Sequence, residues 1–312
     1  MPPGSFAPSK TEVSSVRSKL IPFLIVFFLL VPAAHAGPVP DPQGEWARLT
    51  KEAAEMGLPA RFLRLLPLEF VKLEFADLKN VAAEYHPEGH RMIFHLNLSE
   101  GSQGQRFRPL RQIGNQELAT IYHELFHAYF DYVDFASGTP KMTPQGTRLY
   151  TEAKRFLSCR YTVVELSPGP PQKGVSRKSR IEKRRITERE GWDALNETWG
   201  VFVWWAIWNK LEVTDRFKPA LRWDWNVLEE FLDRLEAAHA SGELTGYFEP
   251  ANQDKRRGIP RWYLAPSYAI SAPEIALLLE VILDESPGMA RLVASWITSP
   301  GEQAGAPALG TC

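Results

Sequence analysis

The chain has 312 residues, which is enough for one large domain or two small ones around a hydrophobic core. Its composition, 44% hydrophobic and 23% charged, is ordinary for a globular protein. A formal net charge of -1 argues against nucleic acid or an anionic membrane surface as the main partner.

The first 36 residues have the layout of a secretory signal peptide. Basic residues up to Lys19 precede the apolar run 20–31, and a small-x-small cleavage sequence ends at Ala36. The apolar run is shorter than the about 20 residues that a membrane span needs. We therefore expect cleavage after Ala36 and a secreted or periplasmic protein. A stable membrane partner is expected only if the segment stays uncleaved as an anchor.

The first elements after the leader are a helix and a small sheet. Asp41 or Gln43 is expected to begin a helix that ends near Met56, and residues 68–76 alternate as in a strand. Residues 81–86 and 91–98 predict a hairpin, which either covers the core or offers its edge to an extended peptide. Its three histidines, His86, His90 and His95, are expected at the surface rather than in a second metal site.

The remaining elements are mostly helical. Residues 99–114 are expected to form a loop, followed by a helix over 116–132 with Asn115 as its N-cap. Further helices are predicted on periodicity and end signals, over 146–164, 191–210, 224–240, 273–283 and 288–297. The stretch 260–270 is expected to be irregular or extended.

These elements predict an α+β protein that is mainly α-helical, with one small antiparallel sheet before the helix 116–132. We expect one domain over residues 37–300, with a charged surface excursion at 167–190 and a flexible tail at 301–312. The two cysteines, Cys159 and Cys312, could pair in an oxidising compartment, but their spacing is not that of a metal site.

The strongest chemical signal lies in the helix 116–132, where the chain reads His-Glu-Leu-Phe-His from His123 to His127. Because a helix turns once in 3.6 residues, the two histidines project from one face and can bind one Zn²⁺. Glu124 is placed beside the open coordination position, where it can accept a proton from the metal's water, whose pKa zinc lowers toward about 7. The apolar flanks of this stretch are typical of a helix that runs through a core.

With this motif the chain resembles the zincin metallopeptidases. The extended metzincin sequence is absent, because Phe130 and Val133 occupy its Gly and third His positions. The gluzincins take their third ligand from a later helix, often within Asn-Glu-x-x-[Ser/Gly/Ala], and the stretch from Asn196 to Gly200 matches that pattern. The resemblance therefore implies that Glu197 completes a His₂Glu zinc site with one open position.

A physical argument also favours Glu197. It lies in a strongly apolar and aromatic stretch, where an unpaired acid would be costly to bury and a cation would be a sufficient partner. The alternative is that Glu197 faces solvent. Glu152 is the second choice as ligand. Its gap of 25 residues from His127 is nearer to the short spacing of many gluzincins than the gap of 70 residues to Glu197. Glu188 and Glu190 are more distant rivals.

Two supporting roles follow from the same resemblance. The Asp found in some gluzincins four residues after the third ligand is replaced here by Val201, so Asp193 or Asp131 is expected to orient a ligand histidine instead. A Tyr or His from a later segment is expected to stabilise the oxyanion, with Tyr268 preferred over Tyr263 and His239.

The sequence thus predicts an exported zinc-dependent metallopeptidase, a hydrolase acting on peptides or proteins with Glu124 as general base. Two alternatives stay open. One is a non-catalytic exported domain that binds zinc structurally or binds a partner. The other is a zinc hydrolase that acts on a non-peptide amide. A fourth protein ligand would favour the non-catalytic domain, and an open water position would favour an enzyme.

Overall fold

The computed structural model describes residues 37–100, 106–167, 169, 181–214, 223–252, 256 and 258–297. All of them belong to one compact unit. The predicted signal peptide 1–36, the predicted tail 301–312 and Cys312 lie outside the described residues, as does half of the predicted charged excursion.

The described part of the chain is α+β and mainly helical, as the sequence predicted. Its helices are α1 (Pro42–Met56), α2 (Arg61–Leu65), α3 (Asn115–Phe135), α4 (Pro144–Arg160), α5 (Glu188–Val213), α6 (Trp225–Ser241), α8 (Ala272–Val281) and α9 (Pro287–Ile297), with short 3-10 turns η1 (Leu96–Leu98), η2 (Leu110–Gln112) and η3 (Pro266–Tyr268). None of the described helices is long and apolar enough to cross a membrane.

Local capping chemistry explains why most helix limits were predictable. The Asp41 carboxylate accepts the Gly44 N–H at 3.0 Å and begins α1, and Gly57 ends it with a φ of 73°. Helix α3 begins one residue earlier than expected, because Gly114 rather than Asn115 is its N-cap, and it ends three residues later, at Phe135. The Glu117 carboxylate accepts the Gly114 N–H at 2.9 Å there.

The first sheet lies before α3 in the chain and has the strand order β1-β2-β4-β3. Its strands are β1 (Gly37–Pro38), β2 (Lys72–Ala76), β3 (Ala83–His86) and β4 (Arg91–His95). The predicted hairpin is confirmed as the antiparallel pair β3–β4, but the sheet is mixed, because β2 and β4 run parallel. The chain crosses from β2 to the far edge and returns, which places β4 between β2 and β3. The β3 strand is therefore an edge of this sheet.

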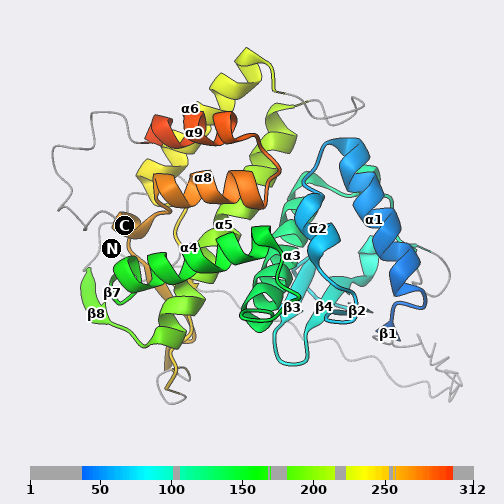
Figure 1. Cartoon of the computed structure of the whole chain (residues 1–312), viewed down its shortest axis with the longest axis horizontal. Helices are drawn as coiled ribbons and strands as arrows, with labels where there is room; N and C mark the ends of the chain where they lie inside the picture. The colour runs from blue at the N-terminus through cyan, green and yellow to red at the C-terminus, as the bar shows by residue number, and fades with distance from the viewer. Residues whose placement is uncertain are drawn as a thin grey trace, which may run out of the picture. The chain divides into compact units, whose positions relative to one another are not determined.

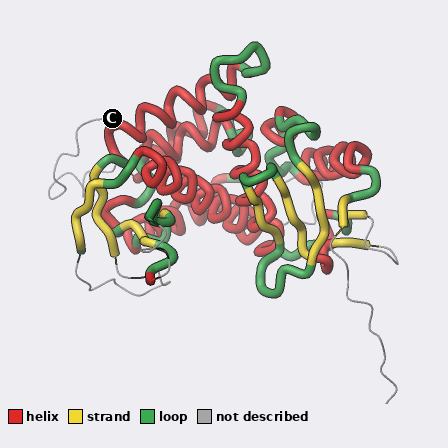
Figure 2. The backbone as a smooth tube through the Cα atoms, turned by 90° about the horizontal axis from the view of Figure 1, so that it is seen from below, coloured by secondary structure: helices red, strands yellow, loops and turns green. Residues whose placement is uncertain are grey.

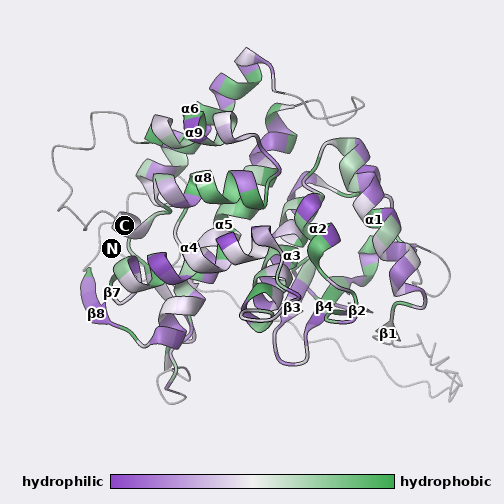
Figure 3. Cartoon of the chain, viewed as in Figure 1, coloured by the Kyte–Doolittle hydropathy of each residue, from purple (hydrophilic) through white to green (hydrophobic). Residues whose placement is uncertain are grey.

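A second four-stranded sheet, which the sequence did not predict, has the order β8-β7-β10-β9. Its strands are β7 (Val163–Ser167), β8 (Glu182–Arg185), β9 (Tyr247–Phe248) and β10 (Trp262–Leu264). Strand β8 lies within the predicted charged excursion, and Figure 3 shows it as hydrophilic. Two further short strands, β5 (Ser99–Glu100) and β6 (Arg106–Phe107), pair with each other.

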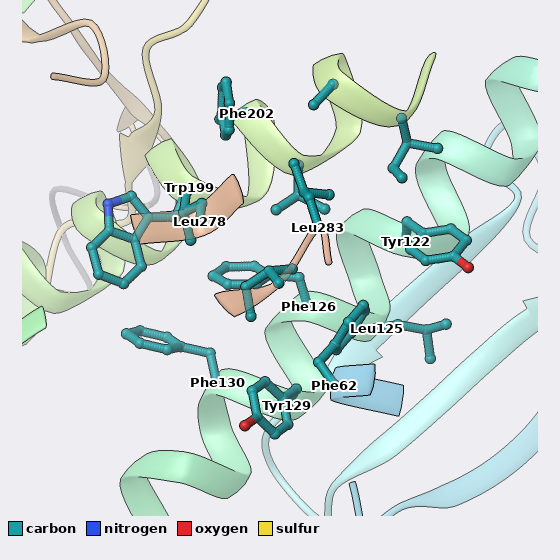
Figure 4. Close-up of a cluster of buried hydrophobic side chains, with 14 of the residues drawn as sticks. Phe62, Tyr122, Leu125, Phe126, Tyr129, Phe130, Trp199, Phe202, Leu278 and Leu283 are labelled. Atoms are coloured by element: carbon teal, nitrogen blue, oxygen red, sulfur yellow. The ribbon is translucent and has the colours of Figure 1, made fainter. Parts of the chain in front are cut away.

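Helix α3 runs through the middle of the described unit. It contacts α5 most extensively and also contacts β3, β4, α2 and α4. Figure 1 shows it between the first sheet and the layer formed by α4, α5 and α8, and Figure 2 shows the two larger sheets at opposite ends of the helices. Its buried side chains include Leu125, Phe126 and Phe130, and Phe130 packs on Trp199 of α5 with ring centroids 5.5 Å apart (Figure 4). Because Phe130 follows His123 by seven residues, the histidines lie on this same side of α3, where Gly200 of α5 approaches both rings.

Candidate metal centre

Helix α3 brings the two predicted histidines together. His123 and His127 are one turn apart, and their Nε2 atoms lie 2.9 Å from each other with the rings nearly perpendicular. The His123 side chain is 17% exposed and that of His127 is 9% exposed, so the pair is mostly buried but reachable from one side. The helical spacing argument for these two residues is confirmed.

Helix α5 brings Glu197 to the same point. Its Oε1 lies 3.7 Å from His127 Nε2, and its Oε2 lies 3.9 Å from His123 Nε2. One ligand atom from each of the three residues lies within 4.8 Å of the others, so the group could hold a metal ion. Glu197 Oε2 is buried and has no hydrogen-bond partner among the described residues, although buried carboxylate oxygens normally have one. A cation at this position would provide that missing partner.

The rival carboxylates bind elsewhere. Glu152 forms an ion pair within α4, Glu188 forms one with a lysine of α4, and Glu190 caps the start of α5. Their partners are Arg155 for Glu152 at 2.6 Å, Lys154 for Glu188 at 3.2 Å, and the Thr187 N–H for Glu190 at 2.9 Å. Among these candidates for the third ligand, Glu197 is the carboxylate that the fold places beside the histidines.

The groups that orient the histidines also come from α5. His127 Nδ1 lies 2.9 Å from Asn196 Oδ1, which is consistent with a ring that donates through Nδ1 and leaves Nε2 for a metal. The carbonyl of Gly200 accepts a hydrogen bond from His123. The expectation that Asp193 or Asp131 would do this is wrong, because Asn196 and Gly200 hold the two rings and Asp131 binds Tyr85 and His90 instead. The Asn of the Asn196–Gly200 motif was the signal that sequence reasoning missed.

Gly200 is required by the close approach of α5 to both imidazoles. A Cβ at this position would lie 2.8 Å from His127 Cε1 and 2.9 Å from His123 Cε1, which is closer than real Cβ contacts allow. The close approach therefore explains why the last residue of the Asn196–Gly200 motif must be small. Any larger side chain must displace the two rings that the group depends on.

Replacing Gly200 by Ala is expected to lower metal affinity by about 10- to 100-fold, the range found when groups that orient metal ligands are disturbed. Competition with a chromophoric chelator measures this affinity. Ala is favoured over Gly in a helix by about 1 kcal/mol, so weaker helix formation would not explain the loss. Gly288→Ala in α9 is the control, since the nearest atom to its Cβ would be Ser286 Oγ at 3.9 Å. Unchanged affinity in Gly200→Ala would contradict the steric argument.

Glu124 stands beside the three ligands. Its Oε1 lies 3.9 Å from His123 Nε2, and its Oε2 accepts the backbone N–H of Tyr85 at 2.8 Å. Burial raises the pKa of Glu124 to about 7, and the neighbouring His127 and the Tyr85 N–H act in the opposite direction. One carboxylate oxygen is thus held by β3 while the other faces the metal group.

Burial also sets the charge state of the ligands. It is the main cause that lowers the pKa of His123 to about 3, with a further contribution from His127, so His123 is neutral near pH 7. A neutral imidazole is the form that binds metals. Burial raises the pKa of Glu197, and a bound cation would reverse this by favouring the carboxylate.

Tyr247, at the start of β9, is the tyrosine that faces the group. Burial is the main cause that raises its pKa, followed by the negative charge of the neighbouring Glu197. The strand contacts α5 at Gly246, whose N–H donates to Thr198 Oγ1 at 3.2 Å. The approach requires glycine, because a Cβ added at this position would lie 2.4 Å from the Thr198 N. The guanidinium of Arg261 lies 4.5 Å from the centre of the Tyr247 ring.

The residues proposed from sequence for the oxyanion role make other contacts. Tyr268 is 3% exposed and its hydroxyl donates to the Val163 carbonyl at 2.7 Å, so the structure does not bring it to the metal group. His239 Nε2 lies 3.0 Å from the Ile270 carbonyl, and the Tyr263 ring packs on the Tyr247 ring at 5.6 Å. No local pattern distinguishes Tyr247 in the sequence, because its position depends on strand pairing with β10.

Comparisons of the chain with protein-family models, with curated proteins and with solved structures return no match. The site is therefore interpreted from its own chemistry. Two imidazoles and a carboxylate form a three-ligand set, and among the described residues no fourth His, Cys, Asp or Glu joins them. Such a set leaves one coordination position for water or substrate, with Glu124 and Tyr247 at its side.

Proposed function

We propose that this chain is an exported zinc-dependent metallopeptidase that resembles the gluzincins. The observation that carries the proposal is the convergence of His123, His127 and Glu197, from two helices, with Glu124 directly beside them. Two imidazoles and one carboxylate suit Zn²⁺, and the unpaired Glu197 Oε2 fits a bound cation. Export rests on the signal-peptide layout of residues 1–36.

Glu124, Tyr247 and Asn196 would each have a separate role in the reaction. When bound, zinc would act as a Lewis acid and lower the pKa of a water in its open position to about 7. Glu124 would take the proton of the attacking water at Oε1 and pass it to the leaving amine. Tyr247, whose raised pKa keeps its hydroxyl protonated, would donate a hydrogen bond to the developing oxyanion. Asn196 would hold His127 with Nε2 toward the metal.

The absence of a fourth protein ligand among the described residues favours an enzyme over a structural zinc site. Structural zinc sites are closed by four protein ligands, whereas catalytic sites keep a position free. The placement of a carboxylate next to that position, with one oxygen fixed by a backbone N–H, also has no use in a structural site.

Zinc content and peptide cleavage test the proposal. The full chain, purified after export, is expected to carry about one zinc ion, and Glu197→Gln is expected to lose most of it under the same dialysis. Glu152→Gln is the matched control, because it removes the rival carboxylate from the surface pair with Arg155 and should leave zinc content unchanged.

Cleavage is measured on a library of quenched fluorescent peptides with the zinc-loaded protein. A wild-type chain that binds no zinc would contradict the proposal as a whole. A zinc-loaded chain that cleaves no peptide would contradict the peptidase assignment and leave the hydrolase of a non-peptide amide as the better explanation.

A further inference from the structure

A second polar cluster lies next to the metal centre, between the β3–β4 hairpin and α3. The Tyr85 hydroxyl donates to Asp131 Oδ2 at 2.5 Å, and His90 Nδ1 lies 2.8 Å from the same oxygen. The Tyr85 hydroxyl is also 3.3 Å from His90 Nδ1. Burial and the hydrogen bond to Asp131 raise the pKa of Tyr85, so its hydroxyl stays protonated and acts as a donor. Neither His90 nor Asp131 contributes to the metal group.

The conformation of the hairpin turn places the His90 ring in this cluster. His90 has a φ of 53°, an unfavourable conformation for a side chain other than Gly, and follows Gly89 with a φ of 89°. Its ring packs on Phe70 with centroids 4.0 Å apart, and its N–H donates to the Pro87 carbonyl at 3.2 Å. A backbone held in such a conformation indicates that the contacts of His90 outweigh the strain.

Tyr85 contacts α3 at two points. Its backbone N–H donates to Glu124 Oε2 at 2.8 Å, and its hydroxyl donates to Asp131, which follows Glu124 by two helical turns. Residues seven apart lie on the same face of a helix, so one strand residue bridges both. Since β3 is an edge strand, its outward amide would otherwise face solvent or a ligand.

We propose that Asp131 and His90 are positioning residues that hold Tyr85 against α3, so that the Tyr85 amide keeps Glu124 Oε1 directed at the metal group. The part of this inference that concerns catalysis rests on the proposed function of Glu124. The mechanical part does not, because it concerns the hydrogen bond between Tyr85 and Glu124. A carboxylate free to rotate would spend part of its time turned away from the reacting water and would transfer protons more slowly.

Hydrogen exchange of the Tyr85 amide tests the mechanical part by NMR, with or without zinc. In the wild type this edge-strand amide is expected to be protected, and Asp131→Asn and Tyr85→Phe are each expected to speed its exchange by about tenfold or more. Asp77→Asn is the matched control, since it removes the acid of another His–Asp pair in the same sheet, with His95 at 3.5 Å. Tyr85→Phe keeps the ring and loses only the hydroxyl, which limits effects on folding.

Steady-state kinetics test the catalytic part. Asp131→Asn and Tyr85→Phe are expected to lower kcat by about 10- to 100-fold, with KM within about twofold and zinc content unchanged. Unchanged Tyr85 exchange in both variants would overturn the inference. Faster exchange with an unchanged kcat would reduce the cluster to a structural link and overturn its positioning role. A wild-type protein that binds no zinc or cleaves no peptide would contradict the proposed function and the catalytic part of the inference. The exchange data would still decide the mechanical part.

Discussion

Replacing Glu124 by Gln is expected to remove hydrolysis while zinc stays bound. The amide can still accept the Tyr85 N–H through its oxygen, so the side chain keeps its place. It cannot accept a proton from water, and the loss of a general base lowers rates by about 10²- to 10⁴-fold. The ligands His123, His127 and Glu197 are untouched, so zinc content should match that of the wild type.

The measurement is kcat/KM on the best peptide from the library, together with the zinc content of each preparation. Asp134→Asn is the control, because it removes an exposed carboxylate from the same helix away from the ligands. A Glu124→Gln variant with wild-type kcat/KM would show that another group takes the proton. Loss of zinc in the same variant would instead make Glu124 a ligand and contradict the assignment of roles.

Replacing Glu274 by Gln is expected to lower the free energy of unfolding more than any other substitution named above. This carboxylate is fully buried and joins three helices that support the site. It forms an ion pair with Arg160 of α4, accepts the Trp199 indole N–H of α5 at 3.0 Å and the Tyr161 hydroxyl at 3.1 Å, and caps its own helix α8 through Ser271. Removal of the charge leaves the buried guanidinium of Arg160 without a charged partner, although it still donates to the Ala269 carbonyl at 3.0 Å.

Breaking a buried ion pair from one side lowers the free energy of unfolding by about 3–5 kcal/mol. Urea denaturation of the wild type and Glu274→Gln measures this difference. Glu280→Gln, also in α8, is the control, because its partner Arg148 is 52% exposed and such a pair contributes about 1 kcal/mol or less. The double variant Arg160→Met with Glu274→Gln should lose less than the sum of the single losses. A Glu274→Gln variant within about 1 kcal/mol of the wild type would contradict this account.

Local chemistry made most helices predictable. The Asp224 carboxylate accepts the Val227 N–H at 3.0 Å at the start of α6, and Gly242 ends that helix with a φ of 75°. Both signals can be read directly from the sequence, because a cap acts on residues within one turn. The β3–β4 hairpin was predictable for the same reason, since its turn and its alternation are local.

The second sheet was not predictable, because its strands pair over long distances and are short. Tyr247 pairs with Tyr263, and Leu264 pairs with Leu166, which comes about a hundred residues earlier in the chain. Strands of two to five residues carry too little alternation to be recognised alone. Since Tyr247 depends on this sheet, the residue expected to stabilise the oxyanion could not be identified from the sequence, and Tyr268 was chosen instead.

The sequence by itself determined that His123 and His127 share one face of a helix and that Glu124 adjoins it, since the helical repeat is a property of the backbone. It also marked Glu197, through a motif and through the cost of burying an unpaired acid, but it left Glu152 as a rival. Tertiary structure decided between them, because the packing of α5 against α3 places Glu197 3.7 Å from His127, and Gly200 permits that approach. The supporting contacts of Asn196, Tyr85 and Tyr247 were decided in the same way, since each joins elements whose relative position follows only from the packed core.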